Sequence, residues 1–78
     1  NLIYSKINNL IMAKIQLNGK KINISSKLTV FDVLKKYKIN EKKVAIELNG
    51  KILPKNNLKK KMIKNLDKIE IVQFIGGG

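Results

Sequence analysis

Residues 12–37 have the sequence MAKIQLNGKKINISSKLTVFDVLKKY. Apolar and polar side chains alternate on both sides of Asn18-Gly19, and the apolar positions are Ile15, Leu17, Ile22 and Ile24. An Asn-Gly pair between two alternating segments is a strong hairpin signal, because both residues tolerate the positive φ values of a type I′ turn. The first half of this segment therefore predicts a strand, a tight turn and a second strand.

The second half of the segment predicts an amphipathic helix. Its apolar residues recur at the helical spacing i, i+3, i+4 and i+7, at Val30, Val33, Leu34 and Tyr37. Thr29 precedes them as a suitable N-cap, and Asp32 places negative charge in the first turn, where it favours the helix dipole. We expect the helix to end near residues 39–40.

A second hairpin and a final strand follow the helix. Alternating residues 44–48 lead into another Asn-Gly pair at Asn49-Gly50, and Pro54 ends the returning strand. Residues 55–64 are rich in Lys and Asn, which predicts a long surface connection, and its apolar anchors are Leu58, Met62 and Ile63. A turn at residues 65–67 then leads into the last strand, residues 68–74.

The order of these elements predicts an α+β fold. Two hairpins on either side of one helix indicate a mixed sheet of four to five strands, with the helix packed across one face and serving as the crossover between strands two and three. A chain of 78 residues has room for one domain. We assign residues 12–75 to that domain and residues 76–78 to a flexible glycine tail. Residues 1–11 are interpreted as a disordered or non-native leader.

The residue types exclude most self-contained catalytic chemistry. The chain has no Cys and no His, so it has no thiol nucleophile and lacks the commonest general base and metal ligands. Its five carboxylates have no spacing typical of a metal site or an acid–base pair. We expect no enzymatic activity, no bound cofactor and no metal. Because no apolar run approaches the roughly 20 residues that cross a bilayer, we expect no membrane association and a location in the cytoplasm or an organelle stroma.

The formal charge of +12 raises an alternative function. A basic chain attracts polyanions, and a small nucleic-acid-binding module could use a cluster formed by Lys55, Lys59, Lys60, Lys61 and Lys64. However, all 17 basic residues are Lys, none is Arg, and they are spread along the whole chain. We therefore favour a solvated, Lys-rich surface and expect no specific nucleic acid.

Three segments, in this order, carry a family resemblance: residues 28–34 of the helix, the strand and turn at 44–50, and the closing run 67–78, which ends in three glycines. Over residues 12–78 the chain resembles the thiamin-biosynthesis sulfur carriers, a ubiquitin-like β-grasp family. It departs from the family pattern at Asn65-Leu66-Asp67, which is often Asp-Gly-Asp, and at Leu58 or a neighbour, where a large aromatic is common. Molybdenum-cofactor sulfur carriers and ubiquitin-like modifiers share the glycine end and stay as alternatives.

The resemblance implies that the reacting group is the carboxylate of Gly78. An E1-like (ThiF-like) adenylyltransferase would consume ATP to adenylate it, and a persulfide donor would supply the sulfur. The resulting thiocarboxylate would pass its sulfur to a ThiG-like thiazole synthase. Gly76 and Gly77 would let the tail thread into the partner, because glycine has no Cβ. Between these transfers we expect a free monomer.

Apolar residues just before the glycines are predicted to dock on the activating enzyme, namely Val72, Phe74 and Ile75. For Val72 and Phe74 the alternative is that both side chains simply complete the hydrophobic core, after a bulge in the strand.

Overall fold

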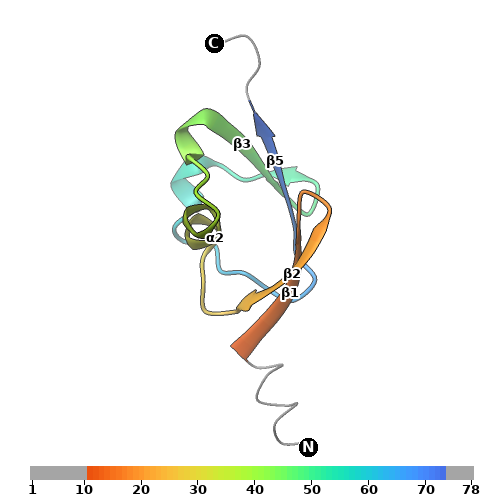
Figure 1. Cartoon of the computed structure of the whole chain (residues 1–78). Helices are drawn as coiled ribbons and strands as arrows, with labels where there is room; N and C mark the ends of the chain where they lie inside the picture. Colours follow the sequence, from red (N-terminus) through yellow and green to blue (C-terminus); the bar gives the residue numbers. More distant parts are fainter. Residues whose placement is uncertain (1–10, 74–78) are drawn as a thin grey trace, which may run out of the picture.

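The computed structural model describes residues 11–73 (Figure 1). Its elements in chain order are β1 (Met12–Leu17), β2 (Lys20–Ser25), α2 (Val30–Lys36), η1 (Glu41–Lys43), β3 (Val44–Leu48), β4 (Lys51–Ile52), η2 (Lys55–Asn57) and β5 (Lys68–Gln73). The predicted leader, apart from Ile11, lies outside the described residues, as do Phe74, Ile75 and the three terminal glycines.

The five strands form one sheet in the order β2-β1-β5-β3-β4. The two Asn-Gly hairpins, β1–β2 and β3–β4, are antiparallel, and β5 lies between them, parallel to β1 and antiparallel to β3. Figure 1 shows α2 on one side of this sheet. The predicted mixed sheet with a helix across one face is confirmed. The helix does connect the second strand to the third, but β5 separates the two hairpins, so they join only through the last strand.

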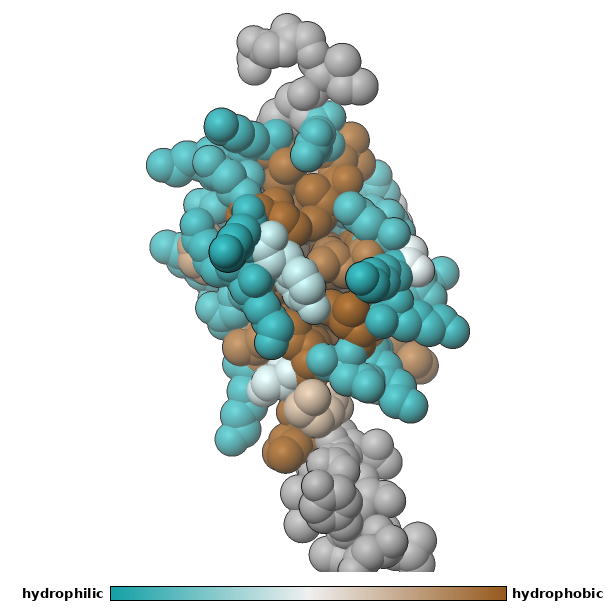
Figure 2. All heavy atoms as spheres, viewed as in Figure 1, coloured by the Kyte–Doolittle hydropathy of each residue, from teal (hydrophilic) through white to brown (hydrophobic). Residues whose placement is uncertain are grey.

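Strand alternation places the apolar side chains on the face of the sheet that α2 covers. The buried core consists of Ala13, Ile15, Ile24, Val30, Val33, Leu34, Val44, Ile46, Leu48, Leu58, Ile63 and Ile69. Viewed from one side, apolar side chains form a band flanked by hydrophilic ones, between α2 and the strands (Figure 2). This core supplies most of the driving force for folding, since burying a large aliphatic side chain contributes about 1.5–3 kcal/mol.

The helix begins where the sequence predicts. The Thr29 hydroxyl accepts a hydrogen bond from the Asp32 N–H at 3.1 Å, and the Asp32 carboxylate accepts one from the Thr29 N–H at 2.9 Å. This reciprocal pair is a capping box with Asp in place of the usual Glu. It satisfies two backbone donors that the first helical turn would otherwise leave unpaired.

The Lys-rich connection covers two more of these donors. The Val30 N–H donates to the Lys61 carbonyl at 2.9 Å, and the Phe31 N–H donates to the Leu58 carbonyl at 3.0 Å. Leu58 and Ile63 are buried, as predicted. The prediction for Met62 as an anchor is wrong, because its side chain is 44% exposed. In an extended segment neighbouring side chains point in opposite directions, so burying Ile63 turns Met62 outward.

The helix ends earlier than predicted, at Lys36, and Tyr37 is the C-cap with a half-exposed side chain. Lys38 adopts a positive φ of 59° and donates its N–H to the Lys35 carbonyl, while the Ile39 N–H donates to the Leu34 carbonyl. These two bonds form a Schellman motif, which normally has Gly at the left-handed position. Because Lys is not typical there, the sequence did not indicate the stop.

The two Asn-Gly turns also hold β5 in place. Both residues of each turn have positive φ values, as a type I′ turn requires. The Asn18 side-chain oxygen accepts from the Ile71 N–H at 2.6 Å. The Asn49 side chain accepts from the Lys68 N–H at 2.9 Å and donates to the buried Asp67 carboxylate at 3.0 Å. Each turn therefore closes its own hairpin and binds the last strand.

The turn before β5 contains a strained residue. Leu66 has a φ of 71°, and its side chain is 75% exposed. Its N–H donates to the Lys14 carbonyl at 2.7 Å, and the neighbouring Asn65 side chain accepts from the Lys14 N–H at 2.8 Å. The backbone of this turn is thus fixed to β1 in a conformation that glycine adopts more readily than leucine.

We expect Leu66→Gly to raise the free energy of unfolding by about 1 kcal/mol, because glycine removes the left-handed strain while the exposed leucine side chain contributes little. Urea denaturation would measure the change. Leu66→Ala is the control, since alanine keeps the strain and should give no gain. A Gly variant no more stable than the parent would contradict this account of the turn.

Asn49→Gly should lower the free energy of unfolding by about 2 kcal/mol, because the positive φ is kept while two side-chain hydrogen bonds to the start of β5 are lost. Asn18→Gly, which loses one such bond, should cost about half as much. The same denaturation experiment checks both variants. Equal stability of Asn49→Gly and the parent would show that the turn geometry alone sets the choice of Asn.

Candidate functional site

In the sequence, the predicted site residues lie at the end of β5 and directly after it. Val72 is the one predicted site residue within residues 11–73, and Gly76, Gly77, Gly78, Phe74 and Ile75 lie outside the described part of the chain. From Gln73, the last residue of β5, the sequence continues directly through these positions to Gly78. The geometry of β5 therefore decides where the C-terminal segment starts.

The strand is held on both sides along its first half and on one side at its end. It pairs with β3 from Leu48↔Ile69 to Val44↔Gln73, but its pairing with β1 is limited to Gln16↔Lys68 and Leu17↔Ile69. The hydrogen bond from the Ile71 N–H to Asn18 is the last link on that side. Figure 1 shows the end of β5 at the opposite end of the molecule from the start of β1.

Val72 lies on the open face of the sheet, away from α2. Its neighbours Ile69 and Ile71 face the core, whereas Val72 pairs with Ala45 and is 47% exposed. The interpretation of Val72 as a core residue is therefore wrong, because strand alternation turns it outward and no bulge restores it. Its predicted docking role stays a prediction.

Further side chains, exposed or partly exposed, share this end of the open face. Glu47 pairs with Glu70 on one side and with Ile52, which is 64% exposed, on the other. Two carboxylates directly opposite each other weaken a sheet slightly. We call Ala45, Glu47, Ile52, Glu70 and Val72 the acidic end of the open face. The alternating sequence could have indicated that each points outward, but not that they meet, since the register of β5 against β3 is not encoded locally.

The other carboxylates have structural roles. Asp32 caps α2, and Asp67 accepts hydrogen bonds from the Lys64 N–H at 2.8 Å and from Asn49. Glu41 lies 3.2 Å from the Lys35 ammonium. A backbone hydrogen bond at Glu41 itself lowers the pKa of its carboxyl below the usual value, and Lys35 lowers it further. Among residues 11–73 no group of three or more Asp and Glu side chains could hold a metal ion.

Two ammonium groups of the alternative nucleic-acid cluster, those of Lys55 and Lys59, contact other parts of the fold. The Lys55 ammonium donates to the Lys42 carbonyl at 3.2 Å, and the Lys61 carbonyl caps α2. The ammonium groups of Lys35 and Lys59 lie 4.9 and 4.8 Å from the centre of the Phe31 ring. The Phe31 ring therefore already makes cation–π contacts with two lysines, which makes it a poor platform for stacking a nucleic-acid base.

No helix within the described part of the chain is long and apolar enough to cross a membrane.

The sequence matches the model of the ThiS family over residues 6–78. It is 37% identical over 65 residues to the sulfur carrier protein ThiS of Bacillus subtilis (strain 168). This match covers 82% of this chain and 98% of that protein. It is also 40% identical over 65 residues to a thiazole synthase of Paramagnetospirillum magneticum, covering 83% of this chain but only 20% of that protein.

The fold agrees with a solved structure of the same kind. The crystal structure of the thiamine biosynthesis protein ThiS from Geobacter metallireducens superposes with a TM-score of 0.73 at 29% identity, covering 83% of this chain and 99% of that one. The family model spans nearly the whole sequence, and the Bacillus relative is matched over almost its full length. The chain therefore belongs to the ThiS family of sulfur carrier proteins and has their β-grasp fold.

Proposed function

We propose that this chain carries sulfur for the thiazole ring of thiamin, and that the carboxylate of Gly78 is its reacting group. The observation that carries the proposal is the combination of ThiS family membership with three glycines that follow a central strand of the sheet at a distance of two residues. The ThiS match favours the thiamin pathway over the molybdenum-cofactor carrier and the ubiquitin-like modifier. We place the protein in the cytoplasm or an organelle stroma.

In this proposal an E1-like, ThiF-like adenylyltransferase activates the C-terminus. A carboxylate oxygen of Gly78 attacks the α-phosphorus of ATP, pyrophosphate leaves, and an acyl-adenylate forms. The terminal sulfur of a persulfide donor then displaces AMP, which departs with one of the original carboxylate oxygens. A thiolate of a partner protein then attacks the donor's sulfur in the acyl disulfide, which releases the thiocarboxylate and leaves a disulfide between that thiol and the donor. A ThiG-like thiazole synthase incorporates the sulfur of the thiocarboxylate.

In this proposal the chain positions its C-terminal segment and gives it a narrow shape, but it supplies no catalytic group. It has no Cys and no His, so the nucleophiles and proton-transfer groups must belong to the partners, and ATP is consumed on the activating enzyme. A well-ordered β5 fixes the base of the C-terminal segment on a rigid sheet. The absence of a Cβ at Gly76 and Gly77 allows this segment to pass through a narrow channel to the reaction centre.

The acidic end of the open face is the docking surface in this proposal, together with Phe74 and Ile75. Val72, Ala45 and Ile52 offer apolar contact beside the start of the C-terminal segment. Glu47 and Glu70 can accept hydrogen bonds from basic side chains of the activating enzyme, whose cations would also relieve the repulsion between the two carboxylates.

Intact-mass analysis after incubation with ATP, the activating enzyme and a persulfide source should show exchange of one oxygen for sulfur at the C-terminus. Deletion of Gly77 and Gly78 should abolish the exchange, because the remaining chain cannot reach the reaction centre. A Lys59→Gln/Lys60→Gln variant is the matched control and should exchange normally. Two results would contradict the carrier role: no exchange in the parent chain, or exchange that is lost in the lysine variant but kept in the glycine deletion.

Val72→Asp should weaken binding to the activating enzyme about tenfold while lowering the melting temperature only slightly, because the side chain is exposed in the free chain and a new charge would be buried in the complex. Phe74→Ala should also weaken binding more than stability. Isothermal titration and thermal unfolding measure the two quantities. Asn56→Asp, which places the same charge at an exposed position of η2, is the control; an equal effect there would point to net charge instead of docking.

A further inference from the structure

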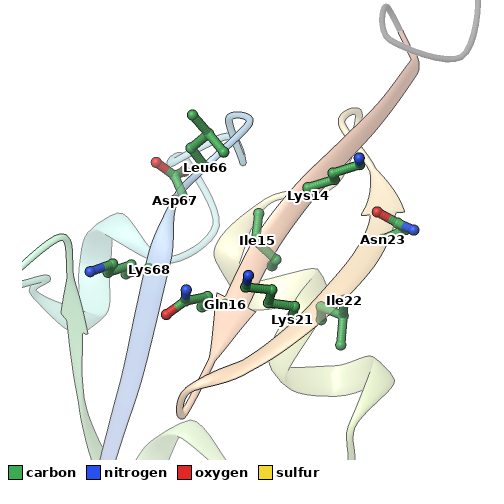
Figure 3. A pocket seen from close by; sticks show the side chains of 9 residues that line it. All are labelled: Lys14, Ile15, Gln16, Lys21, Ile22, Asn23, Leu66, Asp67 and Lys68. Carbon is green, nitrogen blue, oxygen red and sulfur yellow. The ribbon is translucent and has the colours of Figure 1, made fainter. Parts of the chain in front are cut away.

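A groove opens on the sheet where β1, β2 and the turn before β5 meet (Figure 3). Its volume is about 440 Å³, within the range of ligand-binding pockets. Strand register places five polar side chains along it in two rows. Lys14 lies opposite Asn23, and Gln16 lies between Lys21 and Lys68. We call these residues, together with Leu66, the basic groove.

The three ammonium groups of the groove have no direct carboxylate partner in residues 11–73. The adjacent Asp67 is only 7% exposed, and its two carboxylate oxygens already accept from Asn49 and from the Lys64 N–H. Glu70 lies two residues after Lys68 on the same face of β5, and it pairs with Glu47 of β3. The cations of the groove are therefore contributed by β1, β2 and the start of β5, and the two glutamates lie further along β5 and on β3.

Leu66 adds an apolar contact surface to this cationic groove. Its backbone is in the left-handed region at a φ of 71°, and three quarters of its side chain is in water. Both features are unfavourable for folding, and glycine would avoid both. Strained backbone conformations are concentrated at functional sites, so a strained and exposed leucine at the wall of a groove indicates contact with a ligand.

We propose that the basic groove binds an acidic, extended segment of a partner protein. Carboxylates of that segment would pair with Lys14, Lys21 and Lys68, and one apolar side chain would pack against Leu66. The side-chain amides of Gln16 and Asn23 can both donate and accept, which suits the backbone of an extended peptide. A small inorganic anion would use the lysines but would leave Leu66 without a contact, so the leucine favours a peptide.

The position of the groove gives it a role separate from the C-terminus. β5 starts at Lys68 in the groove and ends at Gln73, and five strand steps span about 17 Å. A partner held in the groove leaves the end of β5 uncovered. The carrier can then stay bound to one protein while another acts on Gly78. This consequence rests on the proposed function, whereas peptide binding by the groove does not.

Amide chemical-shift titration of the isotopically labelled full chain tests the proposal. The probes are a capped pentapeptide with two glutamates on each side of a leucine, the same peptide with a central glycine, and pyrophosphate, each at about 0.15 M salt, where the screening length is about 8 Å. Saturable shifts should centre on Lys14, Lys21, Leu66 and Lys68. The leucine peptide should bind about fivefold more tightly than the glycine peptide.

Variants distinguish the groove from general attraction to a basic protein. Lys14→Gln/Lys21→Gln/Lys68→Gln should weaken peptide binding at least tenfold more than Lys27→Gln/Lys51→Gln/Lys60→Gln, which has the same net charge. Leu66→Gly should weaken binding about fivefold although it stabilises the fold, a combination that a purely structural role cannot give.

Three results would overturn the proposal: shifts spread evenly over the lysines of the chain, no saturable shift with either peptide, or tighter binding of pyrophosphate than of the leucine peptide. Sulfur exchange at Gly78 in the groove variants is read out separately. Normal exchange with lost peptide binding would leave the carrier function intact and confirm that the groove is a second site.

Discussion

The structure depends on the insertion of β5 between two hairpins that formed from earlier parts of the chain. Neither hairpin contacts the other as a neighbouring strand, so the sheet becomes continuous only when the last strand pairs with β1 and β3. Asn18 and Asn49 stabilise this arrangement from the tips of their turns. Asn18 accepts a hydrogen bond from β5, and Asn49 accepts one from β5 and donates one to Asp67, just before the strand. The Asn18 bond joins residues 53 positions apart, and the Asn49 bonds join residues 18 and 19 positions apart. Closing such loops has an entropic cost that these pairings must offset.

The same insertion links the fold to the function. The strand that completes the sheet is also the one from which the sequence continues to Gly78. The hydrophobic core holds this strand in place, so it fixes the position from which the proposed reacting segment starts. In the proposed function the chain contributes its C-terminal carboxylate and two differently charged surfaces on the open face. The chain has no Cys and no His, so under the proposed function the steps that need thiols or imidazoles belong to its partners.

Local signals in the sequence predicted local structure well. The Asn-Gly pairs indicated both hairpins, Thr29 and Asp32 marked the start of α2, and alternation identified the core face of each strand. The failures have physical causes. The helix stops at a left-handed Lys38, and Met62 turns outward because Ile63 is buried. Strand order, the pairing of Val72 with Ala45 and the position of Lys68 beside Lys14 and Lys21 all depend on the long-range register of β5, which no local pattern encodes.

The central claim is that Gly78 itself is activated, and an isotope experiment tests it most directly. The C-terminal carboxylate would be labelled with a heavy oxygen isotope, and the chain incubated with ATP, the activating enzyme and a persulfide donor. Mass analysis of the released AMP then follows the labelled oxygen. The account predicts that one labelled oxygen leaves with AMP while sulfur takes its place on the protein. Unlabelled AMP alongside a sulfur-loaded protein would show that the sulfur is carried elsewhere in the chain.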